Sequence, residues 1–340
     1  MIINTSKLYH PQDALKLAFQ AAFGAEHMLG DKEKARANFD EEYAKDLKAA
    51  PLIEEISSSV VRINLAAWKD AKLPANWLFN LFTLSSAEKS ENASQLFDSY
   101  LHELGQLAKN GALPFSDTEW GDYIRTYSLP HPVRHSEEYR KKEKPAYRIV
   151  SGFFLRLIPV LYALRGRHNA IIGIDGRAAS GKSTMADGLA KIFNTKPISM
   201  DDFFLPGELR TEKRLAEPGG NVHYERFAKE VIPNLQSCKA LSYYPFNCRT
   251  MDFDEPKIIP STSFMIIEGA YSHHPYFGQF LDVKVFSDIA HELQIERIKK
   301  RNGERIAEIF FSKWIPMEEK YFSTYKIMEN SCIVVQSPNL

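Results

Sequence analysis

The segment that most restricts how this chain can fold is residues 171–190, IIGIDGRAASGKSTMADGLA. It begins with a β-branched apolar run, which is typical of a buried parallel strand. Gly176, Gly181, Lys182 and Ser183 then satisfy the spacing G-x-x-x-x-G-K-[ST], and apolar residues at helical spacing follow. Strand, glycine-flanked loop and helix therefore occur in the order that a phosphate-binding loop requires.

The residue types in this loop explain how it would bind phosphate. Glycine reaches backbone dihedrals that turn N–H groups inward, and the start of the next helix adds unpaired N–H groups and a positive dipole end. We expect Lys182 to contact the β- and γ-phosphates of ATP and the Ser183 hydroxyl to coordinate Mg²⁺. The residues predicted to bind the nucleotide are Gly176, Ala179, Ser180, Gly181, Lys182, Ser183 and Thr184.

The chain is 340 residues long, which exceeds the usual size of a single hydrophobic core and favours two domains. Residues 1–145 show successive helical patterns and predict an all-helical domain, including a helix that begins near Pro51. Residues 146–340 alternate short β-branched runs with helical stretches. That alternation predicts an α/β fold with a doubly wound, mostly parallel sheet. The boundary is expected between about residues 145 and 167, after a segment rich in proline and charge.

The composition excludes several classes of protein. Lys and Arg total 43 and equal Asp and Glu at 43, so no bulk charge points to nucleic acid or an anionic membrane as a partner. The most apolar segment, 149–164, carries Arg156 and Pro159 and is too short to span a bilayer. Three cysteines form no C-x-x-C pair, and the N-terminus lacks a signal-peptide pattern. These features predict a cytoplasmic protein, and association with copies of itself is left open.

Acidic residues follow two of the predicted strands. Asp201 and Asp202 come after the run that ends at Met200, and Glu268 ends SFMIIE. Because ligands gather at the carboxyl ends of parallel strands, these carboxylates are expected near the phosphate loop. There a carboxylate can hold Mg²⁺ or accept a proton from an attacking hydroxyl. The alternative is that each acid only caps the next helix.

A row of arginines near the C-terminus allows two readings. Arg297, Arg301 and Arg305 recur every four residues, and Gly303 is positioned to interrupt the helix that would carry them. Such a row is usually a solvated helix face. In a phosphoryl-transfer enzyme it can instead form a lid whose guanidinium groups close over the transferred phosphate.

Six motifs together resemble a known family. GIDGRAASGKST, ISMDDFFLP, GGNVHYERF, YYPFNCRTMDF, IIEGAYS and RIKKRNG occur in the order found in the uridine kinase-like branch of P-loop kinases. That branch includes uridine/cytidine kinase, phosphoribulokinase and bacterial pantothenate kinase, and the resemblance covers roughly residues 168–340. It implies that Asp201 is the base, that Glu268 supports Mg²⁺ and that Arg297 and Arg301 belong to the lid. The acceptor-binding residues that it implies are Phe204, His223, Tyr244, Phe246 and Arg249.

One position departs from the family pattern. Nucleoside kinases of this branch carry an aspartate in N-x-D that binds the ribose hydroxyls, whereas this chain has Asn221-Val222-His223. An imidazole cannot supply the same two-oxygen acceptor. We therefore expect uridine to be a weak substrate and His223→Asp to improve nucleoside turnover. Alternatively, His223 lies outside the pocket on the next helix.

The sequence thus predicts a small-molecule kinase that transfers the γ-phosphate of ATP to a hydroxyl group with Mg²⁺. The alternative is a nucleotide-dependent switch or assembly module, in which ATP binding regulates the helical domain. Both hypotheses use the phosphate loop, so only the acceptor side separates them. The N-terminal half resembles the helical extension of some bacterial uridine kinase-like proteins, and its role is not assigned.

Overall fold

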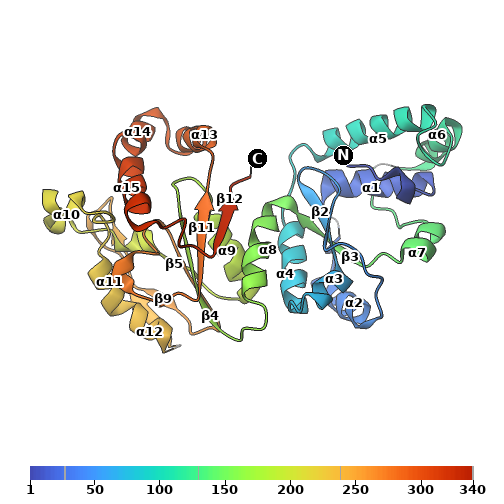
Figure 1. Cartoon of the computed structure of the whole chain (residues 1–340). Coiled ribbons are helices and arrows are strands. Elements are labelled where there is room, and N and C mark those ends of the chain that lie inside the picture. Colours follow the sequence, from blue (N-terminus) through green and yellow to red (C-terminus); the bar gives the residue numbers. More distant parts are fainter. Residues whose placement is uncertain (27, 129, 238, 339–340) are drawn as a thin grey trace. The chain divides into compact units, whose positions relative to one another are not determined.

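The computed structural model describes residues 1–26, 28–128, 130–237 and 239–338. The chain forms two compact units, Met1–Leu155 and Arg156–Leu340 (Figure 1). The division falls inside the range of about 145–167 expected from the sequence, and Tyr147–Ser151 forms a strand of the first unit. No described helix combines the length and the apolar character needed to cross a bilayer.

The first unit is rich in helices that pack through aromatic side chains. Phe97 of α5 contacts Phe19 and Phe23 of α1, with ring centroids 5.8 and 5.5 Å apart. All three rings are buried. The helices are α1 (Pro11–Phe23), α2 (Lys32–Ala44), α3 (Leu65–Asp70), α4 (Ala75–Ser86), α5 (Ala93–Lys109), α6 (Asp117–Thr126) and α7 (Glu137–Glu143), after a 3₁₀ turn at Thr5–Lys7.

The prediction that this unit is all-helical was wrong. It contains a three-stranded antiparallel sheet of β1 (Ile53–Glu55), β2 (Val60–Asn64) and β3 (Tyr147–Ser151), with β2 in the centre. The segment expected to begin a helix near Pro51 instead forms the β1–β2 hairpin. β2 is held by pairing with β3, which lies far along the chain, so its β-branched residues serve as a buried central strand.

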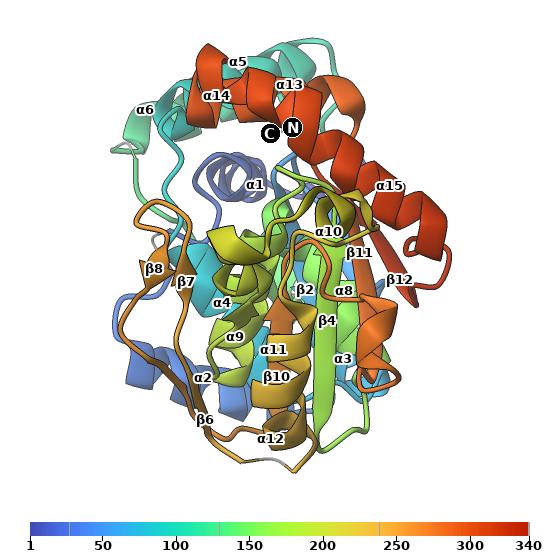
Figure 2. The same cartoon turned by 90° about the vertical axis from the view of Figure 1, so that its left-hand side faces the viewer.

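The second unit contains the predicted parallel sheet. Its strands are β4 (Ala170–Gly176), β5 (Ile198–Ser199), β10 (Phe264–Glu268), β11 (Val283–Asp288) and β12 (Ile333–Gln336). Their order is β12-β11-β4-β10-β5, and every pair is parallel. Figure 2 shows β4 between β10 and β11. β4 is therefore central, which places the phosphate loop that follows it at the middle of the sheet's carboxyl edge.

Helices cover both faces of this sheet, as the doubly wound prediction requires. α8 (Ile158–Ala163) and α9 (Lys182–Phe193) lie on one face, and α11 (Tyr224–Glu230) and α12 (Ile232–Gln236) lie on the other (Figures 1 and 2). Phe227, Leu235 and Tyr321 belong to one buried cluster with strand residues. Tyr321 is on α15 (Ile315–Tyr325), so α15 packs on the same face as α11.

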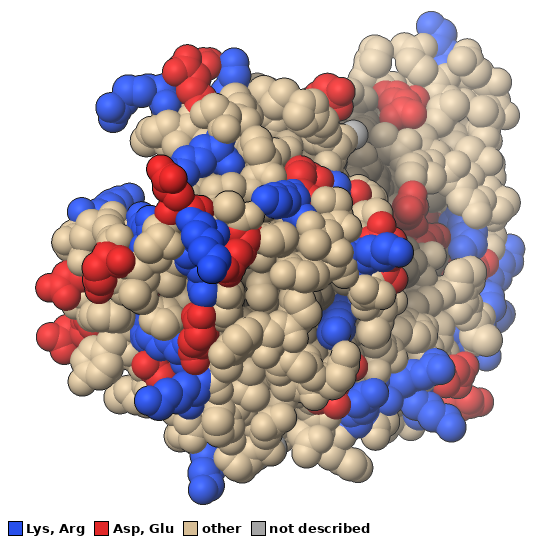
Figure 3. All heavy atoms as spheres, turned by 60° about the vertical axis from the view of Figure 1, so that its left-hand side comes forward, with Lys and Arg blue, Asp and Glu red and all other residues tan. Residues whose placement is uncertain are grey.

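The remaining elements lie in the connections between the strands and helices described above. They are η2 (Gly152–Leu157), η3 (Met200–Phe203), η4 (Gly207–Leu209), α10 (Glu212–Ala216), η5 (Pro275–Phe277), α13 (His291–Asn302), α14 (Glu304–Ile309) and a π-helical turn at Phe310–Trp314, together with the antiparallel pairs β6 (Leu241–Tyr243) with β9 (Lys257–Ile259) and β7 (Phe246–Asn247) with β8 (Asp252–Phe253). Acidic and basic side chains are interspersed over the face seen in Figure 3, in keeping with the balanced composition.

Candidate active site

The loop between β4 and α9 has the backbone that its glycines predict. Gly176 has φ +137°, and a Cβ there would lie 2.1 Å from the carbonyl oxygen of Ser287 on β11. Gly181 has φ +84° and forms the N-cap of α9. Both positions therefore exclude a side chain, one by close packing and the other by conformation. Ala179 also adopts a positive φ of 60°, which an L-residue with a Cβ rarely does.

Lys182 and Ser183 begin α9 at the mouth of this loop. The Lys182 ammonium donates to the carbonyl oxygens of Gly176 at 2.7 Å and Arg177 at 2.9 Å, so it lies across the loop. The Ser183 hydroxyl donates to Oε2 of Glu268 at 3.0 Å. The structure thus brings together the predicted phosphate ligand and the two predicted metal ligands.

Glu268 ends β10 and lies deep in the site. Burial raises the pKa of its carboxyl, and the nearby Asp201 raises it further. Gly269 follows with φ +124°, and a Cβ there would lie 2.9 Å from Cβ of Met200, so the chain passes close to the end of β5. A hydroxyl and a buried carboxylate with acidic neighbours form a hard-oxygen donor set, which fits Mg²⁺ completed by phosphate and water oxygens.

The two adjacent aspartates after β5 have different surroundings. Asp202 accepts hydrogen bonds from the Tyr243 hydroxyl at 2.7 Å and from the Lys257 ammonium at 2.8 Å. No described residue donates a hydrogen bond to the carboxylate of Asp201. Asp201 touches solvent in the cavity yet is surrounded by protein at longer range, and this desolvation raises its pKa against the opposing charge of Lys182. Of these two aspartates, Asp201 is the one whose carboxylate no described donor contacts, so it is available to accept a proton.

A cavity of about 790 Å³ joins most of these groups. The predicted residues that line it are Ala179, Gly181, Lys182, Ser183, Thr184, Asp201, Phe204, Glu268, Arg297 and Arg301. A second hollow of about 420 Å³ shares Asp201 and Phe204 with it and is lined in addition by Phe246 and Arg249. The unpaired carboxylate of Asp201 therefore borders both hollows.

Two residues predicted to bind the acceptor border neither hollow. Tyr244 is 57% exposed on the segment between β6 and β7. His223 is the N-cap of α11, where its Nδ1 accepts a hydrogen bond from the Arg226 backbone N–H at 3.3 Å. A neighbouring carboxylate, Glu225, lies 3.3 Å from the same nitrogen. This is the placement given by the alternative interpretation of His223.

The arginine row is interrupted where the sequence suggested. Gly303 has φ +74° and separates α13 from α14, so Arg305 does not continue the α13 face. Arg297 and Arg301 line the larger cavity, but they differ in their contacts. Arg297 donates to the Ala179 carbonyl at 3.3 Å and to the Ser337 hydroxyl at 2.6 Å, whereas Arg301 contacts only its neighbour Asn302 among hydrogen-bond acceptors in the described chain. Arg301 is thus the freer of the two.

Sequence reasoning missed Glu318 and Asn221. Glu318, on α15, accepts a hydrogen bond from the Ala178 backbone N–H at 3.0 Å, and burial raises its pKa to about 7. Nothing in the local sequence indicates this contact, because α15 lies far along the chain. Asn221 lies within the motif GGNVHYERF, but the departure from the family pattern at the neighbouring His223 gave no indication of a role for Asn221. It is 6% exposed, lines the larger cavity, and its Oδ1 has no partner among the described residues.

Comparisons with known proteins find similarity only among solved structures. No family model matches the chain, and no curated protein matches it. A possible uridine kinase from Bacillus stearothermophilus is 18% identical, with a TM-score of 0.41, covering 53% of this chain and 95% of that one. A proposed fructose transport system kinase from Silicibacter sp. TM1040 is 16% identical, with a TM-score of 0.42 and coverages of 54% and 98%. Shikimate kinase from Bacteroides thetaiotaomicron is 12% identical, with a TM-score of 0.25 and coverages of 49% and 86%. These similarities are weak, so the proposals below rest on the side chains of this chain.

Proposed function

We propose that the protein is a small-molecule kinase that transfers the γ-phosphate of ATP to a hydroxyl group in the presence of Mg²⁺. The observation that carries this proposal is the larger cavity. It combines the Lys182 ammonium, the Ser183–Glu268 pair and the unpaired carboxylate of Asp201. A nucleotide-binding loop alone needs no carboxylate on its acceptor side, whereas a kinase requires one within reach of the attacking hydroxyl.

Each residue has a defined task in this proposal. Lys182 and the backbone N–H groups of the loop bind and orient the phosphates, while Ser183 and Glu268 would hold Mg²⁺. When bound, the metal neutralises charge on the β- and γ-phosphates. Asp201 accepts the proton of the attacking hydroxyl, and its raised pKa makes it a better base than an ordinary aspartate. Arg301 stabilises negative charge on the transferred group.

The second hollow offers a place for the acceptor. Phe204 and Phe246 supply aromatic surface, and Arg249 supplies a guanidinium group at its margin. Asn221 adds an amide oxygen, without a protein partner in the described chain, on the side of the larger cavity. These groups favour a small molecule that has an apolar or planar part and at least one hydroxyl group near Asp201.

The competing function is a nucleotide-dependent switch, in which ATP hydrolysis requires no second substrate. The measurement that separates the two is ADP formation with ATP and Mg²⁺ across a panel of nucleosides, sugars and hydroxy acids. We expect at least one compound to raise the rate of ADP formation and to appear as its phosphate ester. A rate that is the same with every compound would favour the switch.

Lys182→Ala tests the role of the loop. We expect it to lower turnover by at least about 100-fold, because the variant loses the side chain that neutralises the transferring phosphate. Lys191→Ala is the matched control, since Lys191 is exposed near the end of the same helix. Circular dichroism should show that both variants are folded. Unchanged phosphoryl transfer in Lys182→Ala would contradict the proposed function.

A further inference from the structure

The phosphate loop is held by three side chains that donate to consecutive carbonyl groups. Gln294 donates to Ala178 at 3.0 Å. Arg297 donates to Ala179 at 3.3 Å, and Arg156 donates to Ser180 at 3.1 Å. A trans peptide is planar, so its C=O and N–H point in opposite directions. Fixing these carbonyls therefore fixes the direction of the N–H groups that follow them.

Arg156 both hydrogen-bonds to the loop and packs closely against it. It is 8% exposed, and its Nη2 donates both to the Ser180 carbonyl and to the Ser287 hydroxyl at 2.7 Å. The Ser287 hydroxyl donates to the same carbonyl at 3.1 Å. A Cβ on Gly181 would lie 2.7 Å from Nη1 of Arg156, so the guanidinium occupies the space that a side chain at position 181 would need. Glycine at this position of the motif thus makes room for Arg156.

Arg156 is also a buried cation without a counter-ion. No described carboxylate lies within ion-pair distance of Arg156 or Arg297. Burial and the adjacent positive charge of Arg297 together lower the pKa of Arg156 to about 10, so its guanidinium remains charged at neutral pH. Two positive charges beside the loop, with no described carboxylate paired to either, raise the electrostatic potential where the phosphates would bind.

We propose that Arg156 is a positioning residue for phosphate binding, which holds the Ser180 carbonyl outward so that the Gly181 N–H faces the nucleotide. Gly181 lines the cavity, and its N–H donates to no backbone carbonyl in the described chain. The same guanidinium supplies positive charge to the site without touching the ligand. This inference rests on the nucleotide binding proposed above.

Arg156 comes from outside the stretch that carries the kinase motifs, which begins near residue 168. It lies in η2, Gly152–Leu157, which crosses the division between the two units. At the start of η2 the Gly152 N–H donates to the Ser59 carbonyl at 2.7 Å, within the first unit. Arg156 therefore lies directly after the point where the two units divide.

The test is calorimetric titration of the full-length wild type, Arg156→Gln and Arg156→Lys with ATP and with AMP. We expect Arg156→Gln to weaken ATP binding at least about 10-fold, because a charge-assisted hydrogen bond and a nearby positive charge are lost. AMP, which lacks the β- and γ-phosphates, should be affected much less. Arg156→Lys should recover part of the loss. Arg165→Gln is the control for charge, since Arg165 is exposed.

A chemical rescue separates positioning from general stabilisation. Guanidinium at low, non-denaturing concentration should restore ATP binding to Arg156→Ala, because it can occupy the vacated site. Failure of guanidinium to restore binding to a folded Arg156→Ala, or unchanged ATP affinity in Arg156→Gln, would overturn this proposal alone. Failure of the wild type to bind ATP would overturn the proposed function together with it.

Discussion

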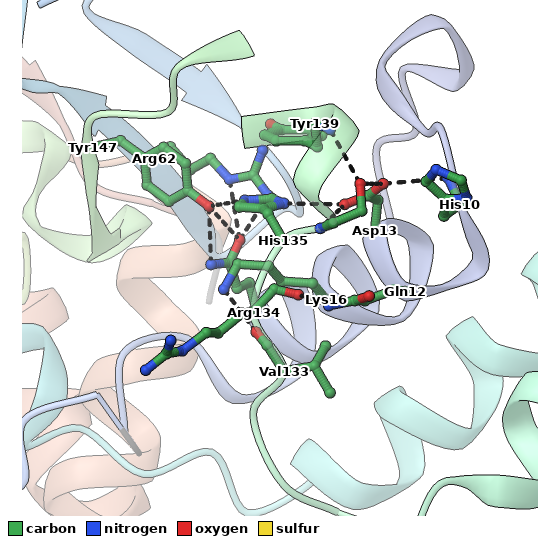
Figure 4. A network of polar contacts seen from close by, with 12 residues as sticks. His10, Gln12, Asp13, Lys16, Arg62, Val133, Arg134, His135, Tyr139 and Tyr147 are labelled. Carbon is green, nitrogen blue, oxygen red and sulfur yellow. Dashed lines mark hydrogen bonds and ion pairs between the residues drawn. The ribbon is translucent and has the colours of Figure 1, made fainter. Parts of the chain in front are cut away.

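Each unit contains a cluster of charged side chains, but the two clusters are paired differently. In the first unit, Asp13 and His135 belong to a network of polar contacts (Figure 4). Asp13 accepts hydrogen bonds from the backbone N–H and hydroxyl of Ser136 at 2.9 and 2.7 Å. Arg62 donates to Gln20 and to Glu54. In the second unit, no described donor reaches the Asp201 carboxylate. A cluster whose charges are paired stabilises the fold, whereas an unpaired charge beside a cavity is available to interact with a ligand.

Burial of charged groups alone therefore does not identify an active site. The first unit also contains groups with perturbed pKa values, and one of them, His135, lines a cavity of about 290 Å³. Burial lowers the pKa of His135 to about 4 and that of Lys16 to about 8. Yet Lys16 donates to the Val133 carbonyl, and His135 contacts the Tyr147 hydroxyl at 2.7 Å. The four predictions below test whether the two clusters differ in the way their contacts indicate.

The largest difference in kcat is expected between variants of the two adjacent aspartates of the second unit. Asp201→Asn should lower kcat by about 10²–10⁴-fold, because it removes the proposed base. Asp202→Asn should instead lower stability, since it weakens the contacts with Tyr243 and Lys257. Steady-state kinetics and urea unfolding of both variants check this. Equal kinetic losses in the two variants would remove the reason for preferring Asp201.

Asp13→Ala tests the paired cluster of the first unit. We expect a loss of about 2–4 kcal/mol in the free energy of unfolding, because several buried donors lose their acceptor. The KM for ATP should be unchanged where the variant is folded. Asp98→Ala, at an exposed position of α5, should alter neither quantity. A large change in the KM for ATP with little loss of stability would contradict a purely structural role for this cluster.

The pH dependence of stability should have opposite signs in the two clusters. His135 has a folded-state pKa of about 4, below the ordinary 6.5, so the unfolded chain binds the proton first on acidification. Its contribution is present above pH 6.5 and is lost as the pH falls towards 4, by about 3 kcal/mol. Glu318 has a raised pKa of about 7, so its contribution is present at acidic pH and is lost as the pH rises through 7.

Tryptophan fluorescence can separate these two effects. Trp68, Trp77 and Trp120 lie in the first unit and Trp314 lies in the second, so Trp314→Phe leaves reporters in the first unit alone. In that background, urea unfolding between pH 4 and 7 should show acid destabilisation that His135→Gln reduces. A pH profile that is the same with and without His135→Gln would show that His135 is not its cause.

The smallest effect on turnover is expected from substitution of His223. Aspartate is also a good N-cap, so His223→Asp should preserve α11. Because His223 borders neither hollow, nucleoside turnover should change by less than about twofold, rather than improve as the sequence suggested. Initial rates with uridine and the preferred acceptor check this. A clear gain with uridine would restore the original interpretation and move the acceptor towards α11.

Much of the second unit could be predicted because its signals are local. The glycines of the phosphate loop are required by local backbone dihedrals, and their spacing can be recognised without knowing the rest of the fold. The parallel sheet followed from the alternation of strands and helices. In the first unit, the β1–β2–β3 sheet was missed because β2 pairs with a strand from the far end of that unit.

The sequence by itself determined that a phosphate loop, Lys182, Ser183 and acids after two strands would meet at one edge of a parallel sheet. It did not determine which aspartate would be free, because Tyr243 and Lys257 reach Asp202 from another segment. Nor did it indicate that Arg156 and Glu318 contact the loop. Such contacts join residues far apart in the chain, and no local periodicity encodes them. These contacts are determined only by the packing of the whole unit, which sets the position of each side chain.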